Sequence, residues 1–241
     1  SSGEITNGPL LLEHARTGCD LILSTGMATL EEVEQALGVI AFGLIHAGDS
    51  EVAPSRDLFA KAFSSELGHK FLKEKVTLLH CTTEYPAPLE EINLRAMLAL
   101  SETFGLKCGY SDHSQGVTVP IAAVALGAPL IEKHFTLDKT LPGPDHKASL
   151  EPIELKEMIS SIRATELCLG TSKKEPTPSE KGNLIVARKS LVAAEGIRKG
   201  EIFTVDNLAI KRPGSGASPM EYWEALGKAS QRDYQADEVL N

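Results

Sequence analysis

Two neighbouring segments of the chain end in a histidine in the same way, and they constrain the fold strongly. Residues 107–113 and 130–136 begin apolar, as buried strands do, and turn polar towards His113 and His134. Each is followed by a segment with helical spacing of its apolar residues, so both are expected to be strand-to-helix units of a parallel sheet. The carboxyl ends of such strands share one edge, where ligands bind. Two imidazoles at that edge are suited to form half of a metal site.

The alternation of strands and helices extends over residues 1–170. Thr29 and Glu32 have the spacing of a capping box that opens a helix. Residues 42–75 interrupt the alternation and are interpreted as an insertion with a helical piece at 58–63. The other expected elements are strands at 21–24, 76–82, 107–113 and 130–136 and helices at 89–100, 117–126 and 149–170. This order predicts an α/β fold with parallel strands joined by crossover helices.

The remainder of the chain has a different character. Residues 171–183 are polar and contain two prolines, which is typical of a linker. Residues 184–241 contain short β-rich pieces, several glycines and one helical segment at 218–225. We expect a second, small domain there, which is marginally stable alone and stabilised by docking.

Composition excludes several classes of function. The net charge of −9 and the lack of a basic stripe argue against nucleic-acid binding. No apolar run approaches the roughly 18 residues that span a bilayer, which argues against a membrane protein. The four cysteines show no paired spacing, and Cys81 and Cys108 are expected to be small buried apolar residues. We therefore expect a reduced, cytoplasmic protein, which can still bind an anion where a metal or a few cations focus the field.

Seven short motifs together resemble the N-acetylneuraminate (sialic acid) synthase family. They occur in the family's order at residues 2–5, 22–27, 80–86, 110–113, 131–135, 143–145 and 211–214. The resemblance implies a (β/α)8 TIM barrel followed by a small antifreeze-like (SAF) domain. It also implies an enzyme that condenses phosphoenolpyruvate with N-acetylmannosamine or a related amino sugar. The implied cofactor is a divalent metal, manganese first and magnesium as the alternative.

The match covers only part of such a barrel. A complete barrel needs roughly 250 residues, and family members carry first strands, a catalytic glutamate and phosphate-binding lysines ahead of the position of Ser1. We expect residues 1–170 to be the C-terminal half of the barrel, 171–183 the linker and 184–241 the SAF domain. Because unpaired strand edges promote association, the chain alone is expected to be inactive and poorly soluble.

Strand alternation assigns the polar residues to faces. Ser111 shares a face with His113, and Glu132 shares one with His134, since residues two apart point the same way. Ser111 then suits a phosphate contact, which is also the role that the family gives it. Glu132 is interpreted either as a partner that orients an imidazole or as a partner of an inward-pointing cation. Asp112 points to the other face and is expected to have a structural role.

The resemblance assigns roles to three residues near the start of the chain. It implies that Ser2 and Ser24 donate hydrogen bonds to the phosphate, whereas serines that cap helices or line turns are the simpler interpretation. Glu4 matches a catalytic glutamate that contacts the amino sugar or assists proton transfer. An exposed glutamate without a role is the alternative.

Three further residues follow the later strands. Tyr85 matches a position that lines the substrate site. Thr83 stands where some members have an asparagine. Its hydroxyl can form one hydrogen bond to phosphate or substrate but lacks the second polar group of an amide. Asp145 resembles a residue that grips sugar hydroxyls, and an ordinary turn aspartate is the alternative. For His113 and His134, the alternative to metal binding is a hydrogen-bonded core histidine.

Arg212 matches an arginine that the SAF domain of one subunit delivers to the sugar in the barrel of the other. The resemblance therefore implies a domain-swapped homodimer of two-fold symmetry. A solvated surface arginine is the simpler interpretation. Two other functions stay open from the sequence: a legionaminic acid-type synthase that uses a diacetamido sugar, and an inactive chain that acts only through its SAF domain.

Overall fold

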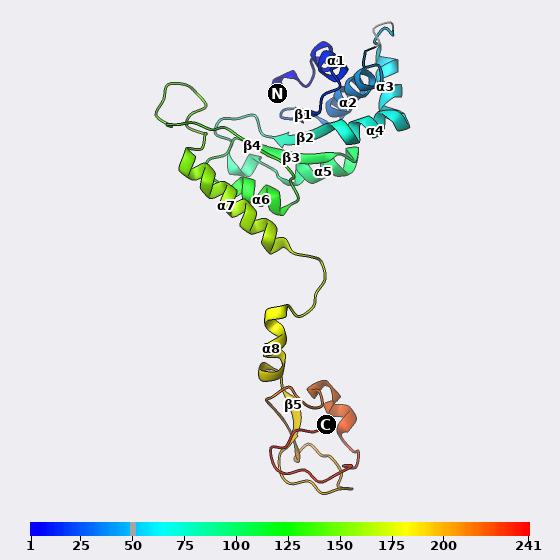
Figure 1. The fold of residues 1–241 in the computed structure, drawn as a ribbon, viewed down its shortest axis with the longest axis vertical. Coiled ribbons are helices and arrows are strands. Elements are labelled where there is room, and N and C mark those ends of the chain that lie inside the picture. Colours follow the sequence, from blue (N-terminus) through cyan, green and yellow to red (C-terminus); the bar gives the residue numbers. More distant parts are fainter. Residues whose placement is uncertain (49–51) are drawn as a thin grey trace. The chain divides into compact units, whose positions relative to one another are not determined.

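The computed structural model describes residues 1–48 and 52–241, and the chain forms two compact units, Ser1–Gly170 and Thr171–Asn241 (Figure 1). The first unit contains a parallel sheet with helices, and the second contains a two-stranded antiparallel sheet. The α/β class predicted from the strand and helix order is therefore confirmed. Among the described residues, no helix is long and apolar enough to cross a membrane.

Four parallel strands form the sheet of the first unit, in the order β1-β2-β3-β4. They are β1 (Leu21–Ser24), β2 (Val76–Cys81), β3 (Lys107–Asp112) and β4 (Ile131–Lys133). Such consecutive parallel pairing is the arrangement of half a barrel. The strand expected at 130–136 is shorter than predicted, because Phe135 leaves the ladder and instead bridges to Leu150.

Helices connect the strands. They comprise α1 (Gly8–Arg16), α2 (Leu30–Ile45), α3 (Arg56–Ser64), α4 (Glu66–Lys75), α5 (Arg95–Phe104), α6 (Thr118–Ala125) and α7 (Pro152–Leu169), with short 3-10 turns at η1 (Ser2–Glu4) and η2 (Leu89–Glu91). The expected capping box is present, since the Glu32 amide donates to Thr29 Oγ1 over 3.2 Å and the Thr29 amide donates to Glu32 Oε2 over 2.8 Å.

Two helical predictions need correction. The helix expected at 89–100 begins only at Arg95, because Asn93 takes a positive φ of 45° that interrupts the helical path after η2. The supposed insertion at 42–75 begins inside α2, where Phe42 is buried, and continues as α3 and α4. Both of these helices pack on α2. Residues 49–51 of that segment lie outside the described residues.

The core of the first unit lies between these helices and one face of the sheet. α5 and α6 both contact β3, and α5 also contacts β2 (Figure 1). Alternate strand residues point into this core, among them Leu78, Cys108 and Tyr110. Cys81 and Cys108 are both buried free thiols, as predicted. Burial of this apolar face fixes the register of the strands, and the register in turn fixes which residues occupy the other face.

Residues 171–177 of the predicted linker form no helix or strand, but its second half is helical. Residues 178–187 form α8 (Pro178–Ala187), which Thr177 and Glu180 open with a capping box that the polar composition concealed. The strands β5 (Ser190–Ala193) and β6 (Leu208–Lys211) pair antiparallel. The helical segment expected at 218–225 is η3 (Pro219–Glu221) followed by α9 (Tyr222–Ala225). A small core holds the unit together through Leu191, Ala193, Ile197, Leu208, Tyr234 and Leu240.

Candidate active site

A cluster of hydroxyl groups forms where β1 and β2 end. The Oγ atoms of Ser2 and Ser24 lie 2.7 Å apart within hydrogen-bonding distance. Gly26 lies against them, since a Cβ added there would be 2.2 Å from Thr83 Oγ1 and 2.6 Å from Ser2 Oγ. Only glycine therefore allows this loop to approach so closely. Ser2, Ser24 and Thr83, which were predicted to contact the phosphate or substrate, therefore lie close together although they come from three separate segments.

The next two strands extend the same face. Ser111 on β3 pairs in register with Cys81 on β2 and with Glu132 on β4. Its hydroxyl donates to Glu132 Oε1 over 2.6 Å. The predicted sharing of a face is thus confirmed, and we call the face that carries Ser111, Glu132, His113 and His134 the site face. Glu132 fills neither of its predicted roles in this structure, because its partner is a hydroxyl group.

Three aromatic rings gather at the carboxyl edge of the sheet. The ring centroids of His113 and His134 lie 5.3 Å apart, with their planes at 71°. The ring of Tyr85 lies 4.2 Å from that of His113 and 5.4 Å from that of His134. The loop after β2 therefore places Tyr85 across both imidazoles, and the two predicted metal ligands are close neighbours.

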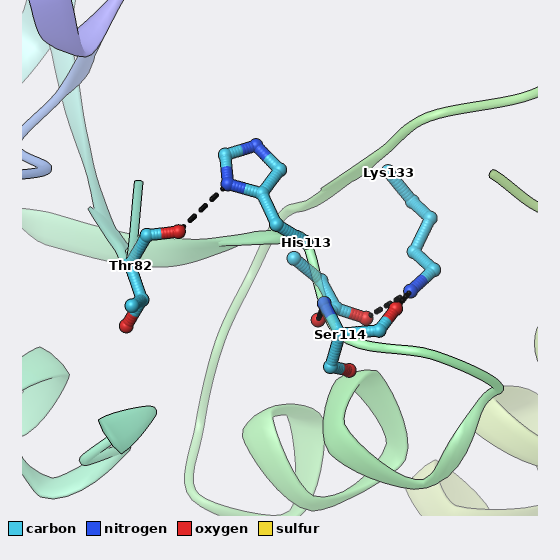
Figure 2. A network of polar contacts seen from close by, with 5 residues as sticks. Thr82, His113, Ser114 and Lys133 are labelled. Carbon is cyan, nitrogen blue, oxygen red and sulfur yellow. Dashed lines mark hydrogen bonds and ion pairs between the residues drawn. The ribbon is translucent and has the colours of Figure 1, made fainter. Parts of the chain in front are cut away.

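His113 is held from two sides by the loop that follows β2. Its Nδ1 donates to the carbonyl of Thr82 over 2.8 Å (Figure 2), and its own carbonyl accepts from the Ala87 amide over 3.0 Å. Because a carbonyl only accepts, Nδ1 carries the proton and the lone pair of Nε2 is left for a ligand. Burial lowers the pKa of His113, but hydrogen bonds to Cys81 and Thr82 and the nearby charges outweigh it, so the pKa is raised overall.

His134 is more exposed and has a carboxylate behind it. Its Nδ1 lies 3.8 Å from Asp145 Oδ2, and about a third of its side chain is exposed. Asp145 comes from the loop between β4 and α7, in which His146 Nδ1 hydrogen-bonds Thr136 Oγ1 over 2.8 Å. The sequence placed Asp145 against sugar hydroxyls, and the structure places it within reach of the second imidazole. A carboxylate behind the Nδ1 of a ligand histidine is a common means of orienting the ring.

These residues fit a divalent metal as two protein ligands. No group of three or more histidine, cysteine or acidic side chains with metal-binding geometry occurs within residues 1–48 and 52–241. However, Nδ1 of His113 donates to a carbonyl, Nδ1 of His134 faces a carboxylate oxygen 3.8 Å away, and no described residue hydrogen-bonds to Nε2 of either ring. Imidazole is a good ligand for first-row transition metals. The geometry suits a site in which substrate and water complete the coordination.

Two predicted residues have partners of their own. Glu4 is exposed and its carboxylate accepts a hydrogen bond from Asn7 Nδ2 over 2.7 Å, beside the start of α1. Arg212 belongs to the second unit, where its exposed side chain donates through Nε to the carbonyl of Ala187 over 3.1 Å. Within the described residues, no hydrogen bond or ion pair joins Glu4 to either histidine.

One group on the site face, the thiol of Cys81, was undervalued by the sequence prediction. Cys81 is buried, but its Sγ lies 3.6 Å from His113 Nδ1 and so belongs to the site as well as to the core. Burial raises the pKa of this thiol, but hydrogen bonds involving His113, Ser2 and Ser24 outweigh it and lower the pKa overall. Strand alternation could have indicated that Cys81 lies on the site face, because it is in register with Ser111.

Similarity to known proteins agrees with this geometry. N,N'-diacetyllegionaminic acid synthase of Campylobacter jejuni is 48% identical over 239 residues, which are 99% of this chain and 64% of that protein. Pseudaminic acid synthase of Campylobacter jejuni is 41% identical over 173 residues, covering 70% of this chain and 50% of that protein. This chain thus spans less than two thirds of the length of either relative.

A solved structure is also similar. The crystal structure of N-acetylneuraminic acid (sialic acid) synthetase from Leptospira borgpetersenii, in complex with citrate, superposes with a TM-score of 0.58 at 34% identity. The match covers 76% of this chain and 54% of that one. The SAF domain model matches residues 188–241, and the NeuB family model matches residues 1–174. The chain therefore belongs to the NeuB family and carries a SAF domain.

Proposed function

We propose that this chain provides the phosphate and metal subsites of an enzyme that condenses phosphoenolpyruvate with an N-acetylated amino sugar to give a nonulosonic acid and phosphate. The observation that carries this proposal is the convergence of a hydroxyl cluster and a pair of imidazoles on one face of a parallel sheet. The relatives that the chain matches are synthases of this class of sugar acid by their names.

The hydroxyl cluster binds the phosphate of the enol substrate. Ser2, Ser24, Thr83 and Ser111 each carry one hydroxyl proton for an anionic oxygen. Ser111 turns its proton from Glu132 to the phosphate, and the Ser2–Ser24 hydrogen bond opens in the same way. Hydrogen bonds to charged groups contribute about 1.5–3 kcal/mol each. The close packing of the loop on Gly26 holds three of these hydroxyls in place before the substrate arrives.

His113 and His134 hold the divalent metal, manganese first and magnesium as the alternative. When bound, the metal supplies Lewis-acid stabilisation of the charge that develops on the aldehyde oxygen of the sugar. The Thr82 carbonyl fixes the tautomer and orientation of the His113 ring, and Asp145, 3.8 Å from Nδ1 of His134, is placed to orient the second ring when the metal binds. Tyr85 covers both imidazoles and reduces the access of bulk water.

The reaction forms one carbon–carbon bond and one carbon–oxygen bond, the latter from water, and breaks the carbon–oxygen bond to phosphate. The methylene carbon of phosphoenolpyruvate attaches to the aldehyde carbon, whose oxygen takes up a proton to become a hydroxyl group. Water adds to the phosphate-bearing carbon and gives one proton to a carboxylate. Phosphate then leaves with the bridging oxygen and takes the proton of the new hydroxyl group, so that a ketone remains. Glu132, hydrogen-bonded to Ser111 on the site face, is the acceptor best placed for that proton. Glu4 remains the catalytic candidate on the sugar side.

A diacetamido sugar is the second candidate substrate. The 48% identity to N,N'-diacetyllegionaminic acid synthase over nearly the whole chain favours it. N-acetylmannosamine is the first candidate, and the similarity to the sialic acid synthetase structure supports it. Arg212 is proposed to meet the acyl group of the sugar from the SAF domain of a second subunit, in a cytoplasmic homodimer.

One experiment tests the reaction class. The protein is expressed from its complete reading frame and supplied with Mn²⁺, phosphoenolpyruvate carrying ¹⁸O in the bridging position, and either amino sugar. We expect the label in the released phosphate and turnover with one sugar of the panel. Label retained in the sugar acid would contradict the proposed bond cleavage, and the preferred sugar decides between the two candidates. A pure, folded protein that releases no phosphate with any sugar would contradict the enzymatic function.

A further inference from the structure

A buried ion pair lies directly behind the two imidazoles, on the face of the sheet opposite to the site face. Asp112 and Lys133 are register partners on β3 and β4, and Lys133 Nζ lies 2.7 Å from Asp112 Oδ2. Their side chains are 0% and 3% exposed. Each residue immediately precedes one of the histidines, Asp112 before His113 and Lys133 before His134.

The pair also fixes the chain beyond His113. Asp112 Oδ1 accepts from the Ser114 amide over 2.8 Å, and Lys133 Nζ donates to the Ser114 carbonyl (Figure 2). Both peptide groups of Ser114 are therefore tied to the pair. The residues on either side of His113 are held by groups that do not touch the site face.

Stability alone gives little reason for such a pair. Removing two charges from water costs several kcal/mol per ion, and apolar replacements of a buried pair are often neutral or stabilising. A geometric role is better supported here, because β4 has only three residues, Ile131–Lys133, and lies at the end of the strand order. The ion pair is the last cross-link between β3 and β4 before the two imidazoles.

We propose that Asp112 and Lys133 are positioning residues that set the separation of the His113 and His134 rings for metal binding. This inference rests on the metal site of the proposed function. When the pair is present, the ends of β3 and β4 move as one body and the imidazoles stay 5.3 Å apart. Without the pair, the end of β4 separates from β3 and the two ligands lose their common geometry.

The test compares two ion pairs in the same protein, expressed from its complete reading frame. The variant is Asp112→Asn with Lys133→Met, which removes both charges and nearly keeps the shape. The control is Asp20→Asn with Lys75→Met, since Lys75 Nζ and Asp20 Oδ1 lie 3.0 Å apart beside the starts of β2 and β1. Mn²⁺ affinity and the spectrum of bound Mn²⁺ are measured by electron paramagnetic resonance, and folding by circular dichroism.

We expect the site variant to remain folded and to bind Mn²⁺ about 10- to 100-fold more weakly, as loss of outer-shell support does elsewhere, with a broadened spectrum. The control keeps the affinity and spectrum of the parent protein. A folded site variant with unchanged Mn²⁺ affinity would overturn the inference. If the double variant does not fold, Lys133→Arg keeps the charge but alters the geometry. Weaker Mn²⁺ binding by that variant supports the inference, and unchanged binding contradicts it.

A second readout separates this inference from the metal site itself. If the parent protein binds no Mn²⁺, the proposed metal site fails, but the positioning role is still visible in the nuclear magnetic resonance signal of the His113 Nδ1 proton. In the site variant this proton is expected to exchange faster with water, since the strand ends loosen. An exchange rate equal to that of the parent would contradict the positioning role.

Discussion

The two faces of one sheet differ in what their polar groups do. On the site face, hydroxyls, imidazoles and a carboxylate have some hydrogen-bonding capacity left for a ligand. We call the opposite face the helix face. There Asp112 and Lys133 pair with each other and hydrogen-bond Ser114, and Nε2 of His80 hydrogen-bonds the Ile92 carbonyl. Successive residues of a strand point to opposite faces. Groups that can bind a ligand and groups that support the strands are therefore neighbours in the sequence but lie on different faces.

The largest expected effect comes from removing the imidazoles. His113→Ala and His134→Ala should each weaken Mn²⁺ binding by more than about 100-fold, because loss of an outer-shell partner alone costs about 10- to 100-fold. Titration followed by electron paramagnetic resonance measures this. His14→Ala, an exposed histidine on α1, is the control and should bind as the parent does. Equal affinity in the site variants and the control would remove the metal site from this face.

The next largest effect is expected from adding a methyl group at Gly26. Gly26→Ala drives a Cβ into Thr83 Oγ1 and Ser2 Oγ, so the hydroxyl cluster must open. We expect phosphoenolpyruvate affinity to fall about 10- to 100-fold, which is the loss of one charged hydrogen bond of about 1.5–3 kcal/mol. Isothermal titration calorimetry gives the affinity. Gly182→Ala on α8 is the control, because a Cβ there meets no atom within 4 Å. Wild-type affinity in Gly26→Ala would show that the cluster does not bind phosphate.

Substitutions of Ser111 and Ser114 compare a hydroxyl group of the site face with a buried hydroxyl group outside it. Ser111→Ala removes a hydroxyl that donates to Glu132, and phosphoenolpyruvate affinity should fall about tenfold. Ser114→Ala removes a buried hydroxyl with no partner among the described residues, so affinity and stability should stay within error of the parent. Calorimetry and urea unfolding measure both quantities. If the two variants have equal affinities, the assignment of Ser111 to the phosphate site is wrong.

The smallest expected effect is in the pH dependence of stability. Burial lowers the pKa of His80 and outweighs its backbone hydrogen bonds, so protonation favours the unfolded chain. The contribution of His80 to stability is present above pH 6.5 and lost as the pH falls below it. Urea unfolding of His80→Asn between pH 7 and pH 5 should therefore show a smaller fall in the unfolding free energy.

His113 should change the pH dependence of stability in the opposite direction. Its pKa is raised in the fold, so its contribution is full below pH 6.5 and is lost as the pH rises through the folded pKa. His113→Asn should therefore steepen the fall in stability from pH 7 to pH 5. If both variants changed the pH dependence in the same direction, the contrast between the two faces would be broken.

The sequence was sufficient for the parts of the fold that periodicity controls. The positions of the strands, the capping box at Thr29 and the shared face of Ser111 and His113 follow from spacing alone. The interruption at Asn93 was not predictable, because a positive φ leaves no mark on apolar spacing. The helix α8 was missed for a related reason, since prolines and charges are typical both of linkers and of the first turn of a helix.

The site shows the same division. Residues at strand ends could be placed together from topology, because parallel strands end at one edge. The approach of Asp145 to His134 depends on loop geometry over 10 intervening residues, which local patterns do not encode. For Arg212, the family resemblance implies a role at the sugar, and the structure of its own unit supplies a backbone partner.

The loop after β2 forms two hydrogen bonds with His113, and these connect binding of phosphoenolpyruvate to binding of the metal. Thr82 and Ala87 bracket Thr83 and Tyr85, and both bond to the same histidine, through its ring and through its carbonyl. An anion that orders Thr83 therefore also orders the imidazole, and a cation on the imidazole orders the loop in return. Linkage requires the two effects to be equal. Phosphoenolpyruvate should raise the affinity for Mn²⁺ by the same factor by which Mn²⁺ raises the affinity for phosphoenolpyruvate.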